Sequence, residues 1–240
     1  MTEYLVFQLY GPLAAWGDIA VGEVRLSVIR PTKSAVLGLV AAALGIRRDE
    51  EDEQRKLAVG YGFAVRVDRP GEPLADYHTI QVPPSSEVRK RGMHTRKDEL
   101  AADKDKLETI LSNREYRMDF VSTVVLWAKA GAPFLLARLA EALSEPCFVP
   151  YLGRKSCPLA LPVQAQVVSA ENIREALEKV SFSSGEILGD LIEKGHRDLY
   201  WDKDGNAGLG PQHEFTARDA VVSRSRWQFD IRHEFHASLE

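Results

Sequence analysis

Cysteine and long apolar runs are both scarce in this chain of 240 residues. The two cysteines, Cys147 and Cys157, could in principle pair, but their spacing is not that of zinc ligands and neither has a histidine nearby. We expect free thiols, no metal and no cofactor. No apolar run approaches the roughly 18 to 20 residues of a membrane span, and the run YLVFQLYG is too short and interrupted for a secretory signal. The sequence therefore predicts a cytoplasmic protein with no membrane contact.

An excess of basic residues is also missing, since 31 Lys and Arg residues stand against 35 Asp and Glu residues, a formal net charge of −4. This balance argues against generic adhesion to nucleic acid. It leaves room for a local basic site, because charges act on a ligand only within about a Debye length, roughly 8 to 10 Å. The composition, 45% hydrophobic and 28% charged, is globular, and the length fits one domain with insertions or two small ones.

Apolar periodicity predicts an alternation of strands and helices. The expected elements are strands at 4–10, 61–67, 119–129 and 159–168 and helices at 36–44 and 134–143. Thr32 or Ser34 should cap the first helix and Gly45 should end it, and residues 49–53 read as an acidic connector. This order, β-α-β, an arm, then β-α-β, is typical of the α+β ferredoxin-like or RRM-like fold, a modified βαββαβ that RNA-binding domains also use.

Two parts of the chain depart from this core pattern. Residues 83–115 are strongly charged with almost no apolar periodicity, which indicates an inserted arm at about 79–117. Beyond the core, expected to span 1–168, a helix at 170–180, a glycine-rich loop at 205–210 and a strand at 227–235 predict an accessory β-rich extension, 169–240. We therefore expect an RRM-like core, an inserted arm and a C-terminal extension.

The start of the first helix combines features that suit a phosphate. Pro31, Thr32, Lys33 and Ser34 offer free backbone N–H groups, two hydroxyls and a cation at the positive end of the helix dipole. The same residues are also ordinary helix caps, and most capped helices bind nothing. Both interpretations stay open at this point.

The arm carries a basic stretch, VRKRGMHTRK at 88–97. Its cations are Arg89, Lys90, Arg91, Arg96 and Lys97. Such a tip could follow a polyanion backbone, with Met93 as an apolar wedge between bases. Acids at Glu87, Asp98 and Glu99 dilute the patch, so a solvated loop is the competing interpretation.

Two further stretches hold candidate contacts. In the run Asp76-Tyr77-His78-Thr79, the carboxylate and the imidazole share one face of a strand and can meet, but no nucleophile motif accompanies them. In YLGRKSCPLALP at 151–162, Gly153 permits close backbone approach and Tyr151 offers a stacking face. Arg154, Lys155 and Ser156 could hold phosphates, although each part also has a reading as ordinary turn chemistry.

The motifs GPLAAWGD, RPTKSAVLGLVAAALGI, DYHT and PYLGRKSCPL resemble those of the CasD family, the type I-E RAMP proteins of the CRISPR surveillance complex Cascade. The resemblance runs in order from residue 4 to about residue 162, and FTARD at 215–219 extends it. It implies a non-catalytic subunit that caps the complex and holds the 5′ handle of the crRNA, with the arm as a thumb. The implied partners are crRNA, the backbone subunit CasC and the large subunit CasA, with target DNA reached only through the assembled complex.

Together, the residues and the resemblance define an expected RNA contact set. Its members are Trp16, Arg30, Thr32, Lys33, Ser34, Tyr77, His78, Arg89, Lys90, Arg91, Met93, His94, Arg96, Lys97, Tyr151, Gly153, Arg154, Lys155 and Ser156. The alternative is a metal-independent endoribonuclease, as in type I-C relatives, that uses His78 or His94 with Tyr77 or Lys33 at a 2′-hydroxyl. A protein-only scaffold is a third hypothesis, and it predicts no bound RNA.

Overall fold

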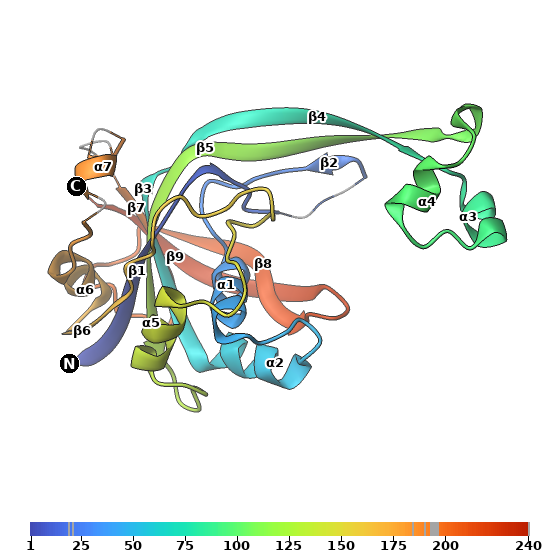
Figure 1. The fold of residues 1–240 in the computed structure, drawn as a ribbon. Helices are drawn as coiled ribbons and strands as arrows, with labels where there is room; N and C mark the ends of the chain where they lie inside the picture. The colour runs from blue at the N-terminus through green and yellow to red at the C-terminus, as the bar shows by residue number, and fades with distance from the viewer. Residues whose placement is uncertain (19, 21, 184, 190, 193–196, 240) are drawn as a thin grey trace.

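The computed structural model describes residues 1–239 except 19, 21, 184, 190 and 193–196 (Figure 1). Its framework is a nine-stranded, mostly antiparallel sheet in the order β6-β1-β5-β3-β7-β9-β8, with β2 and β4 also paired to β5. The strands are β1 (Thr2–Ala14), β2 (Val24–Arg25), β3 (Tyr61–Arg69), β4 (Glu72–Val82), β5 (Glu108–Ala128), β6 (Gln166–Ala170), β7 (Arg197–Asp202), β8 (His213–Ser223) and β9 (Gln228–Leu239). The chain is thus a mixed α/β protein.

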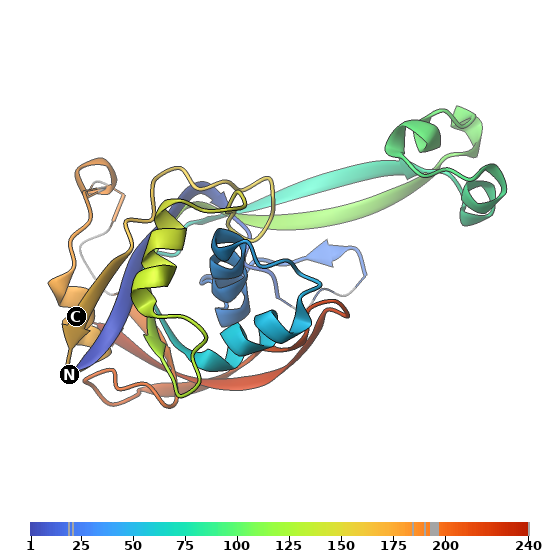
Figure 2. The same ribbon diagram turned by 60° about the horizontal axis from the view of Figure 1, so that its bottom comes forward.

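Helices cover both faces of the strands around β1, which explains the unbroken apolar run at the start of the chain. Leu5, Phe7 and Leu9 belong to a core shared with α1 (Lys33–Leu44) and α5 (Leu136–Ser144). These two helices lie side by side (Figure 2). The alternate residues of β1 pack in a second cluster with α6 (Ile173–Lys179) on the other face. A strand buried on both faces needs no polar alternation.

The caps predicted for α1 are present. The Thr32 hydroxyl accepts a hydrogen bond from the backbone N–H of Ala35, and Gly45 ends the helix with a φ of 79°. The acidic connector prediction was wrong, because residues 51–60 form α2 (Glu51–Gly60) with acids in its first turn, where they favour a helix. None of the helices in the described part of the chain is long and apolar enough to cross a membrane.

A two-stranded arm projects from the sheet (Figure 1). Its strands β4 and β5 pair continuously from Glu72 opposite Met118 to Val82 opposite Glu108. The tip between them contains α3 (Ser85–Arg91), α4 (Arg96–Leu100) and the short 3-10 helix η1 (Lys104–Lys106). The strand predicted at 119–129 is therefore the second half of a 21-residue strand that runs from the arm into the core.

The prediction was also wrong at 159–168, where β6 begins only at Gln166. The preceding residues form turns fastened to β1 by backbone hydrogen bonds, including Gln8 N–H to Val163 O at 2.9 Å. In the last third, β7 pairs with β3, and β9 and β8 extend the same sheet, with α7 (Gly185–Leu188) before β7. The division at residue 168 stays a prediction, and the sheet runs across it.

Candidate nucleic-acid interface

A groove of about 1500 Å³ opens beside α1. Its walls come from residues between 15 and 30, from α1 and the residues that follow it, from 148–154, and from the hairpin of β8 and β9. Eight arginines line it, namely Arg25, Arg30, Arg47, Arg48, Arg154, Arg218, Arg224 and Arg232. The acids that line it are Asp18, Asp219 and Glu234, so cations outnumber anions among the lining residues.

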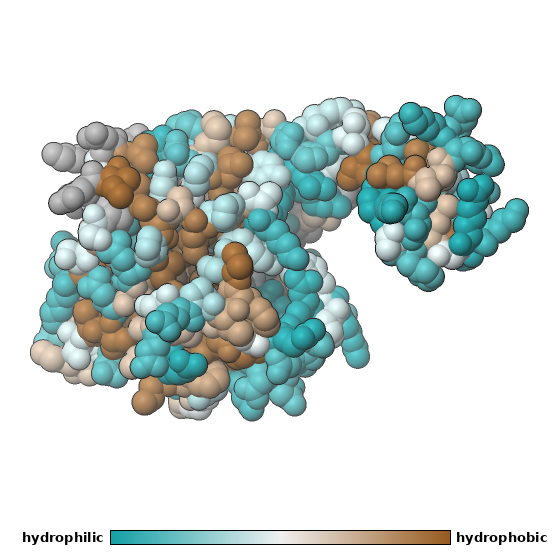
Figure 3. All heavy atoms as spheres, in the orientation of Figure 1, coloured by the Kyte–Doolittle hydropathy of each residue, from teal (hydrophilic) through white to brown (hydrophobic). Residues whose placement is uncertain are grey.

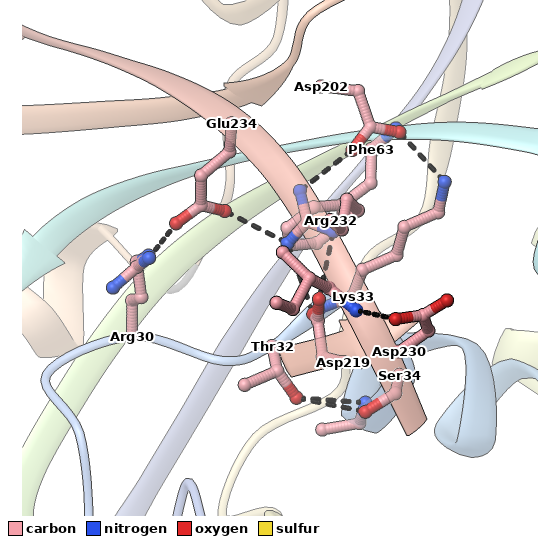
Figure 4. A network of polar contacts seen from close by, with 12 residues as sticks. Arg30, Thr32, Lys33, Ser34, Phe63, Asp202, Asp219, Asp230, Arg232 and Glu234 are labelled. Carbon is pink, nitrogen blue, oxygen red and sulfur yellow. Dashed lines mark hydrogen bonds and ion pairs between the residues drawn. The ribbon is translucent and has the colours of Figure 1, made fainter. Parts of the chain in front are cut away.

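The inner end of the groove is a buried ion-pair network (Figure 4). Arg232 bonds the carboxylates of Asp219 at 2.9 Å, Glu234 at 2.9 Å and Asp202 at 2.8 Å. Arg30 pairs with Glu234, and its guanidinium carbon lies 4.1 Å from the centre of the Tyr200 ring. Burial lowers the pKa of Arg30. The network ties β7, β8 and β9 to the chain that enters α1.

The predicted phosphate donors at the start of α1 already have partners inside the protein. The Lys33 backbone N–H donates to the Asp219 carboxylate at 2.7 Å, and Thr32 caps the helix. The Lys33 ammonium pairs with Asp202 at 2.7 Å, and burial lowers its pKa against the opposing effect of Asp202. The Lys33 side chain therefore does not fit its assignment as an RNA contact, whereas Thr32 and Ser34 do line the groove.

Trp16 also belongs to the interior. Its side chain is 2% exposed and makes an edge-on contact with Phe120, with ring centres 5.4 Å apart. Its backbone N–H is held by the Ser27 hydroxyl at 3.0 Å. The expected RNA contact of this tryptophan does not fit its burial, so its part in the GPLAAWGD motif is to pack the base of the groove.

The loop that follows residue 150 is both basic and structural. Gly153 has a φ of 85°, and a Cβ there would lie 1.8 Å from the carbonyl oxygen of Ala15. Arg154 donates to the carbonyl oxygens of Glu115 at 2.9 Å and Arg25 at 3.2 Å, which ties the base of the arm to the groove wall. Tyr151 is half-buried at the groove, and Lys155 and Ser156 are exposed.

The remaining expected contacts lie on the arm, apart from the groove (Figure 1). His78 pairs with Asp76 along β4, as their shared strand face predicts, and Tyr77 on the opposite face is 61% exposed. The basic stretch lies at the tip, in and around α3 and α4; its members there are Arg89, Lys90, Arg91, Met93, His94, Arg96 and Lys97. Arg91 and Arg96 pair with nearby glutamates, and hydrophilic side chains dominate the tip around an apolar patch (Figure 3).

The expected contact set held two of the eight groove arginines, Arg30 and Arg154, and missed the other six. Arg47 and Arg48 follow α1, and Arg218, Arg224 and Trp227 come from the β8–β9 hairpin. A basic-aromatic run was visible as SRSRWQF at 223–229. It could not be placed beside α1 because that contact joins residues more than 170 positions apart in the chain.

Glu51, the first residue of α2, fixes the turn of the β8–β9 hairpin through hydrogen bonds. Glu51 accepts hydrogen bonds from the backbone N–H of Ser225 at 2.7 Å and the Ser223 hydroxyl at 2.9 Å. The Ser225 side chain, the Ser225 backbone N–H and the Ser223 hydroxyl, in that order, lower the pKa of Glu51 to about 2 through hydrogen bonds. Arg224 is buried against the Ser34 carbonyl oxygen, and burial together with the neighbouring Arg48 cation lowers its pKa.

Comparison with known proteins matches this architecture over nearly its whole length. A family model described as "CRISPR-associated protein (Cas_Cas5)" matches residues 4–233. The chain belongs to the CRISPR-associated Cas5 family. The Cascade subunit CasD of Escherichia coli (strain K12) is 32% identical over 212 residues, which cover 85% of this Cas5 chain and 88% of CasD.

Solved structures have the same fold as this Cas5 chain. A chain of a CRISPR RNA-guided surveillance complex superposes with a TM-score of 0.67 at 26% identity, covering 99% of this chain and 90% of that one. A crystal structure of a Cas protein gives 0.59 at 25% identity, covering 98% and 94%. The family resemblance predicted from the sequence motifs is confirmed.

Proposed function

We propose that this protein is a non-catalytic, crRNA-binding subunit of a Cascade surveillance complex in CRISPR defence, and that it holds the 5′ handle of the crRNA in the groove beside α1. The proposal rests on its similarity to CasD, a Cascade subunit. The observation that carries it is that the groove arginines fall into two groups, one bonded within the protein and one exposed. Arg30, Arg154, Arg224 and Arg232 are engaged inside the protein, whereas the other four keep exposed side chains.

The four exposed cations, Arg25, Arg47, Arg48 and Arg218, give the groove the chemistry of a phosphate-binding surface. Its floor on α1 includes the small residues Ala35, Gly38 and Ala42, and the Arg224 guanidinium lies over Gly38, 3.4 Å from where a Cβ would stand. Tyr151, Phe148 and Trp227 supply aromatic faces along the walls. A few unpaired nucleotides are the ligand that best matches this combination.

The geometry gives the endoribonuclease alternative little support. General acid-base cleavage needs two groups close to one phosphodiester. Lys33 is buried in its pair with Asp202, and Tyr77 and His78 point to opposite faces of β4. His94 lies at the arm tip. None of the pairs named for that mechanism meets within the described part of the chain.

The strand order supports a ferredoxin-like, RRM-like core as part of the proposal. β1, β3, β5 and β6, with α1 and α5 as connections, lie in the order β6-β1-β5-β3 and are all antiparallel. We propose that residues 1–168 carry this core, that the arm serves as a thumb, and that 169–240 form the extension. CasC and CasA are the proposed neighbours in Cascade, and the cytoplasm is the expected compartment.

The proposal is tested by the salt dependence of RNA binding. Each phosphate contact removed from single-stranded RNA should lower the slope of log affinity against log salt by about 0.7, so Arg47→Ala with Arg218→Ala should lower it by about 1.4. The control is Arg138→Ala with Arg174→Ala, which removes two exposed arginines outside the groove. Binding of the cognate repeat RNA is measured by filter retention. Equal slopes for both double variants would contradict the placement of the RNA in the groove. No binding by the wild type would contradict the whole proposal and favour a protein-only scaffold.

A further inference from the structure

Trp227 stands apart from the other tryptophans of the chain. Its side chain is 58% exposed, whereas those of Trp16, Trp127 and Trp201 are 2%, 8% and 2% exposed. It lies in the turn between β8 and β9, on the wall of the groove. An exposed indole beside a cation-rich groove is accessible to a ligand held in that groove.

The backbone holds this side chain in an uncommon conformation. Trp227 has a φ of 57°, in the left-handed region that bulky residues rarely adopt. Residues in such regions persist where the surroundings enforce them, and they cluster at binding sites. The turn that contains Trp227 is held in two ways. Glu51 accepts hydrogen bonds from the Ser225 backbone N–H and the Ser223 hydroxyl, and the Trp227 N–H donates to the Arg224 carbonyl oxygen at 3.4 Å.

The indole is surrounded by groups that suit a nucleotide. The guanidinium carbon of Arg48 lies 4.8 Å from the ring centre and that of Arg224 lies 5.7 Å away. Phe229 meets the ring edge-on at 5.5 Å and 89°, which fixes the indole plane without covering it by a parallel stack. Arg48 is exposed, so a planar group can take its place over the ring while the cation moves to a neighbouring phosphate.

We infer that Trp227 is a stacking platform for one unpaired nucleobase of the RNA held in the groove, with Arg48 bound to a phosphate next to that base. The inference rests on the proposed function, and it names how the groove distinguishes unpaired bases from a duplex. Base–aromatic stacking accepts every base, because each has a π-face. In a duplex the bases are stacked on one another inside the helix, so no base face is free to stack on Trp227.

The arrangement of tryptophans provides a direct assay. Since the other three indoles are buried, Trp227 is the one tryptophan on which a nucleobase can stack, and such stacking should quench the intrinsic tryptophan fluorescence. We expect single-stranded cognate repeat RNA to quench the wild type on binding, and we expect Trp227→Phe to bind without quenching. Trp227→Ala should weaken binding by about 5- to 150-fold, with the phenylalanine variant in between.

The salt slope separates stacking from charge. Trp227→Ala removes no cation, so its log-log slope should equal that of the wild type, whereas Arg48→Ala should lower the slope by about 0.7. The same RNA annealed to its complement should lose the contribution of Trp227, so wild type and Trp227→Ala should bind this duplex equally. The phenylalanine variant, which keeps an aromatic ring against Phe229, controls for damage to the fold.

The possible results separate this inference from the proposed function. If the wild type binds RNA without quenching and Trp227→Ala binds equally well, the platform is wrong and the groove function stands. If Trp227→Ala keeps its RNA affinity but no longer assembles with the other Cascade subunits, the indole is a protein contact and the platform is again wrong. Failure of the wild type to bind RNA overturns both.

Discussion

Removing the carboxylate of Asp219 should destabilise the fold more than any change at the groove surface. The side chain is 4% exposed; it accepts two hydrogen bonds from Arg232, at 2.9 and 3.1 Å, and one from the Lys33 backbone N–H at 2.7 Å. Removing one partner of a buried charge pair costs about 3 to 5 kcal/mol. Arg232 keeps its contacts with Asp202 and Glu234, so we expect Asp219→Ala to cost about 3 kcal/mol.

For a chain of this length, 1 kcal/mol shifts Tm by roughly 2 to 4 °C, so Asp219→Ala should lower Tm by about 6 to 12 °C. Asp219→Asn should lose less, because an amide oxygen still accepts the Lys33 N–H. The matched control is Asp230→Ala, an exposed carboxylate on the same hairpin, which should change stability by less than about 0.5 kcal/mol. Scanning calorimetry gives the comparison. A Tm for Asp219→Ala equal to that of the control would refute a buried role for the network.

Three other changes test the Glu51 hydrogen bonds, the loop at Gly153 and the arm. Glu51→Gln should lower Tm at pH 7, and the difference from wild type should shrink as the pH falls from about 4.5, the ordinary pKa, toward 2, the folded pKa; a difference that is constant with pH would contradict this. Gly153→Ala should lower Tm and weaken RNA binding together, because its Cβ would lie 1.8 Å from Ala15 O, and unchanged values would show that the loop can move freely. Replacing residues 83–107 by Asn-Gly, which joins Val82 to Glu108 as a hairpin, should leave calorimetric melting of the core near wild type and impair Cascade assembly in size-exclusion chromatography; loss of the folded core would show that the arm is integral.

The elements predicted well from sequence are those whose signals are local. α1 begins at a threonine cap and ends at a glycine, and both signals lie within the helix's own sequence neighbourhood. The core half of β5 was found for the same reason, through its apolar residues. α2 was missed because only Gln54, Leu57 and Gly60 of its residues are buried, which is too weak a pattern to reveal a helix among so many charges.

The strand predicted at 159–168 is absent over 159–165, where the chain is irregular and Pro162 interrupts the apolar run. Val163 is buried there, and its carbonyl oxygen accepts a hydrogen bond from the Gln8 N–H. The composition of the run resembles a strand, but prolines remove the donors that a sheet ladder needs. The apolar pattern therefore predicted a strand where the chain is irregular, and of the apolar residues at 159–168 only Val163 is buried, whereas Val167 is 36% exposed.

The roles of the site residues were harder to predict from the sequence than the helices and strands. Some cations at this site pair with carboxylates inside the protein, whereas others are exposed to a ligand. The Lys33 ammonium pairs with the carboxylate of Asp202, which lies 169 residues away along the chain. Nothing in the local sequence PTKS separates an ammonium that pairs inside the protein from one that meets a phosphate. Only the sheet order, which brings β7, β8 and β9 beside the start of α1, makes that distinction.

This placement also explains how an acidic protein can present a basic groove. Asp202, Asp219 and Glu234 neutralise Arg30, Lys33 and Arg232, three charges against three, within the interior. Because these six charges cancel, the cluster contributes nothing to the net charge of −4, and it projects little field toward the groove mouth because the partners are in direct contact. The cations at the mouth then act on a ligand within a Debye length, while acids on distant surfaces are screened. Affinity for RNA should therefore follow the exposed arginines of the groove and not the net charge of the chain.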